Sequence, residues 1–61
     1  MNKATLQKEA WIYKHRGEPY WYEYHIESQG FFTEVYAANA SQARIKGWNA
    51  FVATRAGRKY R

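Results

Sequence analysis

The sequence predicts an α+β domain in which a three-stranded antiparallel sheet packs against one C-terminal helix. Three observations support this fold class: strict alternation over residues 20–28, a Gln29-Gly30 turn followed by an aromatic and β-branched run, and an alanine-rich stretch bounded by Asn39 and Gly57. With 61 residues the chain has room for a single core. We therefore expect one βββα domain over residues 1–57, followed by a basic tail over residues 58–61.

The clearest element is a hairpin over residues 20–38. Alternation divides the first strand into an inward face of Tyr20, Tyr22, Tyr24 and Ile26 and an outward face of Trp21, Glu23, His25 and Glu27. After the turn, residues 31–38 are expected to return as the second strand. A two-residue or a four-residue loop predicts the same register, with Tyr24 opposite Val35, Tyr22 opposite Ala37, His25 opposite Glu34 and Glu23 opposite Tyr36.

A further strand is expected before the hairpin, over residues 10–14. It is closed by residues 16–19, whose Gly17 and Pro19 mark a turn. Leu6, Ala10 and Tyr13 also lie at helical spacing, so a short N-terminal helix over residues 4–11, before the strand begins, stays open.

The C-terminal helix is expected over residues 40–56. Asn39 and Gln42 have the spacing of a capping box, and Gly57 is a suitable C′ residue. Small residues dominate one helical face, which would let the helix lie close to a sheet covered with tyrosine. A second apolar stripe consists of Ile45, Trp48 and Val52, and on so short a chain it predicts self-association into a small homodimer.

The net charge of +5 is concentrated at the C-terminus. In residues 1–54, six Lys and Arg face five Glu, which leaves +1, and the other four charges lie in residues 55–61. A basic tail and dispersed cations favour contacts with phosphates. The candidate nucleic-acid-binding residues are Lys14, Arg16, Arg44, Lys46, Arg55, Arg58, Lys59, Tyr60 and Arg61.

The outward strand face holds the only group that resembles a catalytic or metal site. It collects His25 with three carboxylates, those of Glu23, Glu27 and Glu34. Cross-strand charge pairing is the more ordinary role of such a group, and one His without Cys or Asp is a thin ligand set. We therefore predict no enzyme, no cofactor and no metal.

Three rings share that outward face: Trp21, Phe32 and Tyr36. They are either covered by the N-terminal segment or exposed for binding, and if exposed they suit a protein partner better than phosphates because of the neighbouring glutamates. Together with Ile45, Trp48 and Val52 they form the candidate protein interface.

The stretch Val35-Tyr36-Ala37-Ala38-Asn39-Ala40-Ser41-Gln42-Ala43 runs from a strand into a capped helix. It is similar to many small phage and prophage proteins without assigned activity. Over residues 10–56, the order of three strands and a helix resembles the arm-binding domain of tyrosine-recombinase integrases and the plant ethylene-response DNA-binding domain. It also resembles the sheet and second helix of the double-stranded-RNA-binding domain.

These resemblances imply a non-enzymatic nucleic-acid-binding accessory protein of a phage or mobile element, touching phosphates with its tail and helix ends. The alternative is a protein-interaction module, such as a phage inhibitor of a host enzyme, or a small homodimer. No apolar run exceeds four residues, so neither a membrane span nor a secretory signal is expected. We expect a cytoplasmic protein that binds nucleic acid or a host protein and no membrane.

Overall fold

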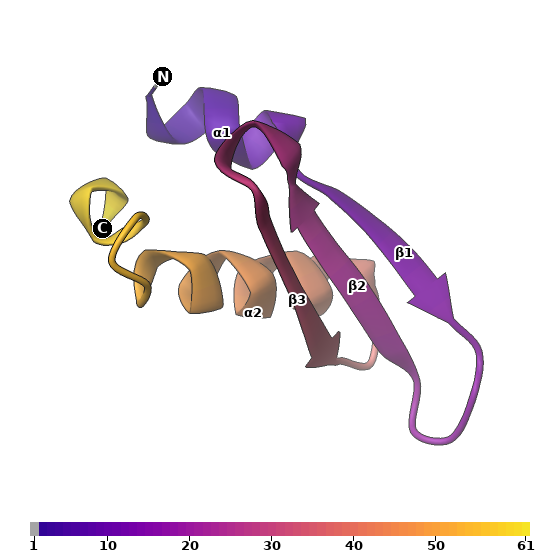
Figure 1. Cartoon of the computed structure of the whole chain (residues 1–61). Coiled ribbons are helices and arrows are strands. Elements are labelled where there is room, and N and C mark those ends of the chain that lie inside the picture. The colour runs from indigo at the N-terminus through magenta and orange to yellow at the C-terminus, as the bar shows by residue number, and fades with distance from the viewer. Residues whose placement is uncertain (1) are drawn as a thin grey trace.

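The computed structural model describes residues 2–61 and confirms the α+β class. A short N-terminal helix, a three-stranded antiparallel sheet and a C-terminal helix follow one another along the chain (Figure 1). The elements are α1 (Lys3–Glu9), β1 (Trp11–His15), β2 (Trp21–Ile26), the 3-10 turn η1 (Glu27–Gln29), β3 (Phe31–Tyr36), α2 (Ala40–Val52) and the 3-10 turn η2 (Arg58–Tyr60). Within residues 2–61, no helix is long and apolar enough to cross a membrane.

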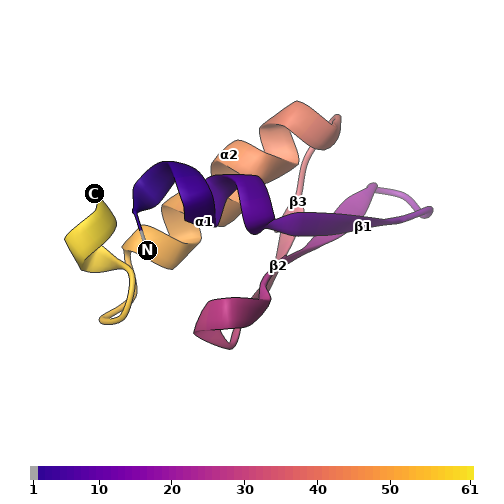
Figure 2. The same ribbon diagram turned by 90° about the horizontal axis from the view of Figure 1, so that it is seen from above.

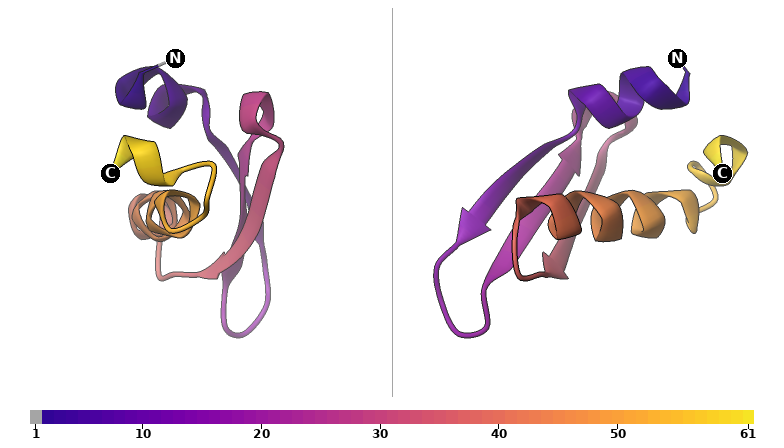
Figure 3. Two further views of the ribbon diagram at one scale, coloured as in Figure 1. Left: turned by 60° about the vertical axis from the view of Figure 1, so that its left-hand side comes forward. Right: turned by 180° about the vertical axis from the view of Figure 1, so that it is seen from behind.

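The short N-terminal helix that the sequence left open is present, and it precedes the strand. Asn2 caps α1, since its Oδ1 accepts a hydrogen bond from the Thr5 N–H at 2.9 Å. The helix ends at Ala10 and β1 begins at Trp11. Both helices lie on the same side of the sheet, which leaves its other face open (Figures 2 and 3).

The predicted faces of residues 21–26 are correct, but Tyr20, expected inward, precedes β2 and is 48% exposed, and Glu27 leaves the strand for η1. The predicted register of the hairpin is wrong by two residues. Tyr22 lies opposite Val35, Tyr24 opposite Thr33, His25 opposite Phe32 and Glu23 opposite Glu34. The strand stops at Ile26 because residues 27–29 turn into η1, and Gly30 then takes the left-handed conformation (φ 61°) that lets the chain return. A shift of two residues keeps every side chain on its face.

The core lies between the sheet and the two helices. Its larger cluster joins Leu6 and Ala10 to the sheet and to α2, and consists of Leu6, Ala10, Tyr24, Ile26, Trp48 and Phe51. A smaller cluster of Tyr22, Val35 and Ala43 continues it. Gly47 allows this contact because a β-carbon there would overlap the Tyr24 ring. The small-residue face of α2 therefore packs on the tyrosines as expected.

The C-terminal helix is shorter than predicted, because α2 ends at Val52 and residue 56 lies beyond it. Thr54 Oγ1 donates to the Phe51 carbonyl at 2.5 Å, a side-chain hydrogen bond that competes with continued helix. Gly57 does not serve as a left-handed C′ residue, since its φ is −92°. It is needed instead because a β-carbon there would overlap the Phe51 carbonyl.

The basic tail expected after residue 57 folds back onto the domain. Residues 58–60 form η2, and the Tyr60 ring lies 6.0 Å from that of Phe51 and 6.4 Å from that of Trp48, measured between ring centroids. The last residues therefore belong to the packed domain, although Arg58, Lys59 and Arg61 remain exposed.

Candidate functional site

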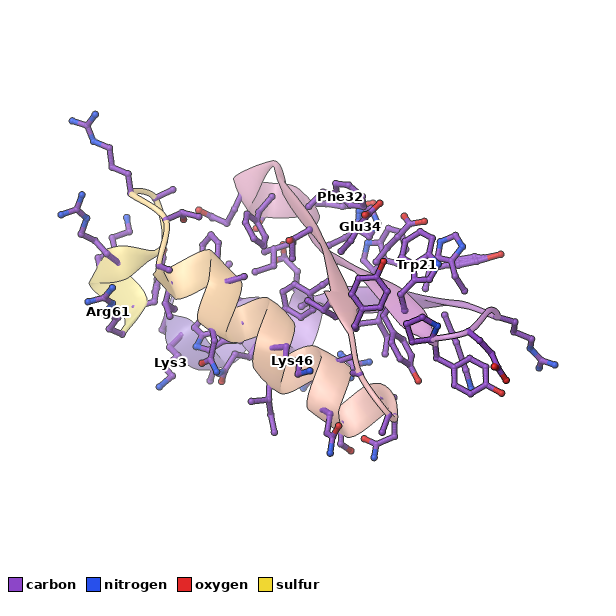
Figure 4. All side chains as sticks on the ribbon, turned by 90° about the horizontal axis from the view of Figure 1, so that it is seen from below. Lys3, Trp21, Phe32, Glu34, Lys46 and Arg61 are labelled. Atoms are coloured by element: carbon purple, nitrogen blue, oxygen red, sulfur yellow. The ribbon has the colours of Figure 1, made fainter. Side chains whose placement is uncertain are left out.

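The most distinctive surface is the face of the sheet that the helices do not cover, which we call the open face. Cross-strand register arranges its side chains in three rows of three. The rows are Trp11, His25 and Phe32; Tyr13, Glu23 and Glu34; and His15, Trp21 and Tyr36. Trp21, Phe32 and Glu34 project from the sheet on the side away from α2 (Figure 4). Seven of these nine side chains are rings.

Most rings of the open face contact one another, both across the strands and along β1. The Trp11 and His25 rings are parallel with centroids 3.9 Å apart, and the His15 and Trp21 rings are parallel at 3.6 Å. Phe32 leans against His25 at 4.7 Å, and Tyr13 stacks on His15 at 4.8 Å. Each histidine therefore has a tryptophan against its flat side, and these rings are held in place before any partner arrives.

Several of these rings keep a large surface in contact with water. The exposed fraction is 41% for Trp11, 51% for Tyr13, 51% for Phe32 and 58% for Tyr36. Of the two alternatives that the sequence left open, coverage of this face by the N-terminal segment is wrong, since Leu6 of α1 packs into the core on the other side of the sheet. Trp21, in contrast, is half-buried beneath the His15 ring.

Glu23 lies at the centre of the open face and joins the two histidines. Its Oε2 lies 2.5 Å from His15 Nε2, and its Oε1 lies 2.9 Å from His25 Nε2. These hydrogen bonds hold the pKa of the Glu23 carboxyl below its ordinary value, and the bond to His15 has a larger effect than the bond to His25. Both carboxylate oxygens of Glu23 are thus occupied by imidazole nitrogen.

Sequence reasoning placed part of this surface correctly and missed the rest. Trp21, Phe32, Tyr36, Glu23, His25 and Glu34 are where the alternation put them. Glu27 is not on the face, because it belongs to η1. Trp11, Tyr13 and His15 were missed, although the alternation of residues 11, 13 and 15 was a signal that could have found them.

The second predicted interface, on α2, is not an exposed stripe. Trp48 is buried against Leu6 and Phe51, and Val52 is half-buried beside it. Only Ile45 of these three is well exposed, at 61%. A single exposed side chain is ordinary on a protein surface, so this stripe gives no support to a homodimer through α2.

The predicted phosphate-binding residues do not form one patch. Lys14 and Arg16 lie near the β1–β2 turn, with Lys14 Nζ 4.6 Å from the centre of the Tyr20 ring. Both chain termini, and with them the basic tail, lie at the other end of the molecule, where Lys3 and Arg61 are labelled (Figures 1 and 4). Arg55, Arg58 and Lys59 are exposed in the segment that precedes Arg61.

Three of these cations hydrogen-bond to backbone carbonyls of the domain. Arg44 Nη1 donates to the Ala10 carbonyl at 3.1 Å, Lys46 Nζ donates to Tyr36, and Arg61 Nε donates to Val52 at 3.3 Å. They tie α2 to the C-terminal end of α1 and to β3, and the C-terminus to α2. These three cations therefore have a role in the fold that is independent of any phosphate.

Two hollows are present, one at the edge of the open face beside Tyr36 and one away from it. A shallow depression beside the β1–β2 turn is lined by residues 17–20 and 36–38. A smaller hollow of about 250 Å³ lies between α1 and α2, over Tyr24 and Trp48, with Arg44 at its rim. Among residues 2–61, no three His, Cys, Asp or Glu side chains are grouped to hold a metal ion.

Comparisons of the chain with protein-family models, with curated proteins and with solved structures find no match.

Proposed function

We propose that this protein is a non-enzymatic interaction module and that the open face is the surface with which it binds another protein. The observation that carries the proposal is the exposure of Trp11, Tyr13, Phe32 and Tyr36 on one uncovered sheet face. Exposed aromatic groups of this kind are typical of protein interfaces, where Trp and Tyr are enriched among the few residues that dominate the binding energy.

The stacking of the rings adds to this argument. A side chain that is already fixed loses little conformational freedom on binding, and each freely rotating side chain costs about 0.5–1.5 kcal/mol when a complex immobilises it. Trp11 and Trp21 are held by His25 and His15, and both histidines are held by Glu23. The open face is therefore prepared for a partner in the free protein.

A catalytic role forms no part of the proposal. The Nε2 atoms of His15 and His25 are both engaged by Glu23, and the cluster lies on an open sheet rather than in a pocket that excludes water. We also propose, on the sequence grounds given above, that the protein is located in the cytoplasm and is encoded by a phage or mobile element.

The proposal is tested by capturing partners on the immobilised protein from a nuclease-treated lysate. The variant carries Phe32→Ala and Tyr36→Ala, which remove two exposed rings without touching the core. Ile45→Ala is the matched control, since it removes an exposed apolar side chain from α2. We expect the double variant to lose proteins that the parent and the control retain. Equal capture by all three would refute the open face as the binding surface.

Nucleic-acid binding is the second candidate function, and it is favoured by a different observation. The exposed cations Arg55, Arg58, Lys59 and Arg61 lie at the same end of the protein as Lys3 (Figure 4). Such a group fits phosphates and needs no contribution from the open face. A retained partner that disappears after nuclease treatment would favour this candidate.

A further inference from the structure

The charge of the open face is opposite in sign to that of the protein. The chain carries ten Lys and Arg against five Glu, yet none of the nine residues of the open face is Lys or Arg. The face holds two glutamates, Glu23 and Glu34, which lie directly opposite one another in the register. Like charges in this position are unfavourable, and a positively charged partner would relieve the repulsion.

The two glutamates differ in what they already bind. Glu23 accepts hydrogen bonds from both histidines. Glu34 is exposed, and none of the described residues forms an ion pair with it. On β3 it lies between Phe32 and Tyr36, at the two-residue spacing that puts all three side chains on the open face. This edge strand therefore presents a carboxylate between two exposed rings.

We propose that the open face receives an arginine-bearing segment of the partner protein, with the guanidinium against Phe32 or Tyr36 and hydrogen-bonded to the Glu34 carboxylate. The inference rests on the proposed function and names the chemistry of its partner. A guanidinium combines the two properties that this site requires, because its plane stacks on aromatic rings and its N–H groups pair with a carboxylate. An ammonium group lacks the stacking plane.

Two other occupants fit the face less well. A nucleic acid would stack on the rings but would bring phosphates to Glu23 and Glu34. A second copy of the chain, docked face to face, would bring together both glutamates of each copy with no Lys or Arg between them. An arginine-bearing segment meets neither obstacle.

In the test, the protein is titrated with three short peptides and the binding is followed by NMR. The peptides differ at one residue, which is arginine, lysine or citrulline. Citrulline keeps the shape of arginine without its charge. We expect shifts of Phe32, Glu34 and the Trp11 and Trp21 indole resonances, with arginine binding most tightly and citrulline least. Loss of an exposed cation–π or charge-assisted contact corresponds to about fivefold in affinity.

Glu34→Gln should lower the affinity for the arginine peptide by about fivefold and leave the affinity for the citrulline peptide unchanged. The matched control is Glu27→Gln, which makes the same charge change on η1, off the open face. Equal binding of the arginine and citrulline peptides, equal effects of the two variants, or no shift at millimolar peptide would overturn the inference. So would an oligothymidylate that shifts these resonances more strongly.

The outcome is separable from that of the proposed function. If Phe32→Ala with Tyr36→Ala abolishes capture of a protein while Glu34→Gln and the arginine peptide have no effect, the open face binds proteins through its rings alone. The guanidinium inference then fails and the interaction module stands.

Discussion

Glu23 is the residue on which the order of the open face depends. It accepts hydrogen bonds from His15 and His25, and each of these histidines supports a stacked tryptophan. A neutral amide at this position would form weaker hydrogen bonds and could not compensate a protonated imidazole. Loss of the carboxylate should therefore loosen both ends of the face at once.

This arrangement predicts a specific dependence of stability on pH. Because folding lowers the pKa of Glu23, the carboxylate stabilises the fold fully above the ordinary pKa of a glutamate, and this stabilisation is lost as the pH falls through the lower folded value. Glu23→Gln should be less stable than the parent at neutral pH and should approach it in acid. Thermal unfolding followed by circular dichroism from neutral pH to about pH 2 measures this.

Glu27→Gln serves as the control, because it removes the same charge from a glutamate that lies exposed on η1, off the open face. Its melting temperature should follow that of the parent across the range. Melting curves of Glu23→Gln that stay a constant interval below those of the parent, down to the lowest pH, would contradict the role assigned to Glu23.

Which residues of the face could be predicted depended on how clear the alternation was. Residues 20–28 alternate over a full strand, so Trp21, Glu23 and His25 were placed correctly from sequence. Trp11, Tyr13 and His15 follow a segment whose Leu6 and Ala10 have helical spacing, and the two periods overlap there. Ring stacking and the two hydrogen bonds to Glu23 depend on cross-strand register, which sequence alternation alone does not determine.

The close approach of α2 to the sheet depends on Gly47. Its Cα faces the Tyr24 ring, and the first ring carbon would overlap an added β-carbon. Tyr24 is fully buried between Gly47 and its neighbours, so the ring has little freedom to move away. Alanine would improve the intrinsic helix propensity by about 1 kcal/mol, but overpacking a core costs about 1–3 kcal/mol.

We therefore expect Gly47→Ala to reduce the free energy of unfolding by about 1 kcal/mol, the difference between the middle of the overpacking range and the gain in helix propensity, measured by urea denaturation. Gly17→Ala, in the β1–β2 turn where no atom lies near the added β-carbon, should change it little. A Gly47→Ala protein as stable as the parent would show that α2 can move away from Tyr24 without loss.

The elements themselves were predictable to different degrees. Alternation and a single glycine turn were enough to define the hairpin and its faces, whereas the register depended on η1, whose residues Glu27–Gln29 carry no strong turn signal. The start of α2 at Asn39 was predicted because its cap is local, with Oδ1 accepting from the Gln42 N–H at 2.9 Å. Its end was not, because the Thr54 hydroxyl interrupts the helix before Gly57.

Across the entire chain, charge and rings are separated onto different sides. The open face holds the exposed rings of Trp11, Tyr13, Phe32 and Tyr36 and two glutamates, while eight of the ten Lys and Arg lie in α1, α2 and the segment after α2. This separation lets the two candidate functions be tested one at a time. Changes to the tail should affect the binding of phosphates without affecting the binding of a protein to the open face.

For nucleic-acid binding we predict that the basic end supplies most of the salt dependence. Each phosphate contact contributes about 0.9 to the slope of log affinity against log salt for duplex DNA, so replacing Arg58, Lys59 and Arg61 with Gln should flatten that slope by roughly 2–3 units. Tyr60 is kept because its ring packs on Phe51 and Trp48. Affinity measured by gel retardation at several salt concentrations should fall without a change in sequence preference, since phosphate contacts carry no sequence information.

Two further variants locate the nucleic acid on the protein. Lys14→Gln with Arg16→Gln removes two charges at the opposite end and should change the slope little if the tail alone contacts phosphates. Glu34→Gln should strengthen binding only if the open face lies near the nucleic acid, because removing a negative charge acts over about a Debye length. If the parent retards neither duplex DNA, duplex RNA nor single strands even at low salt, the basic end has no such role. Its cations then serve the fold, as Arg61 does when it donates to the Val52 carbonyl at the end of α2.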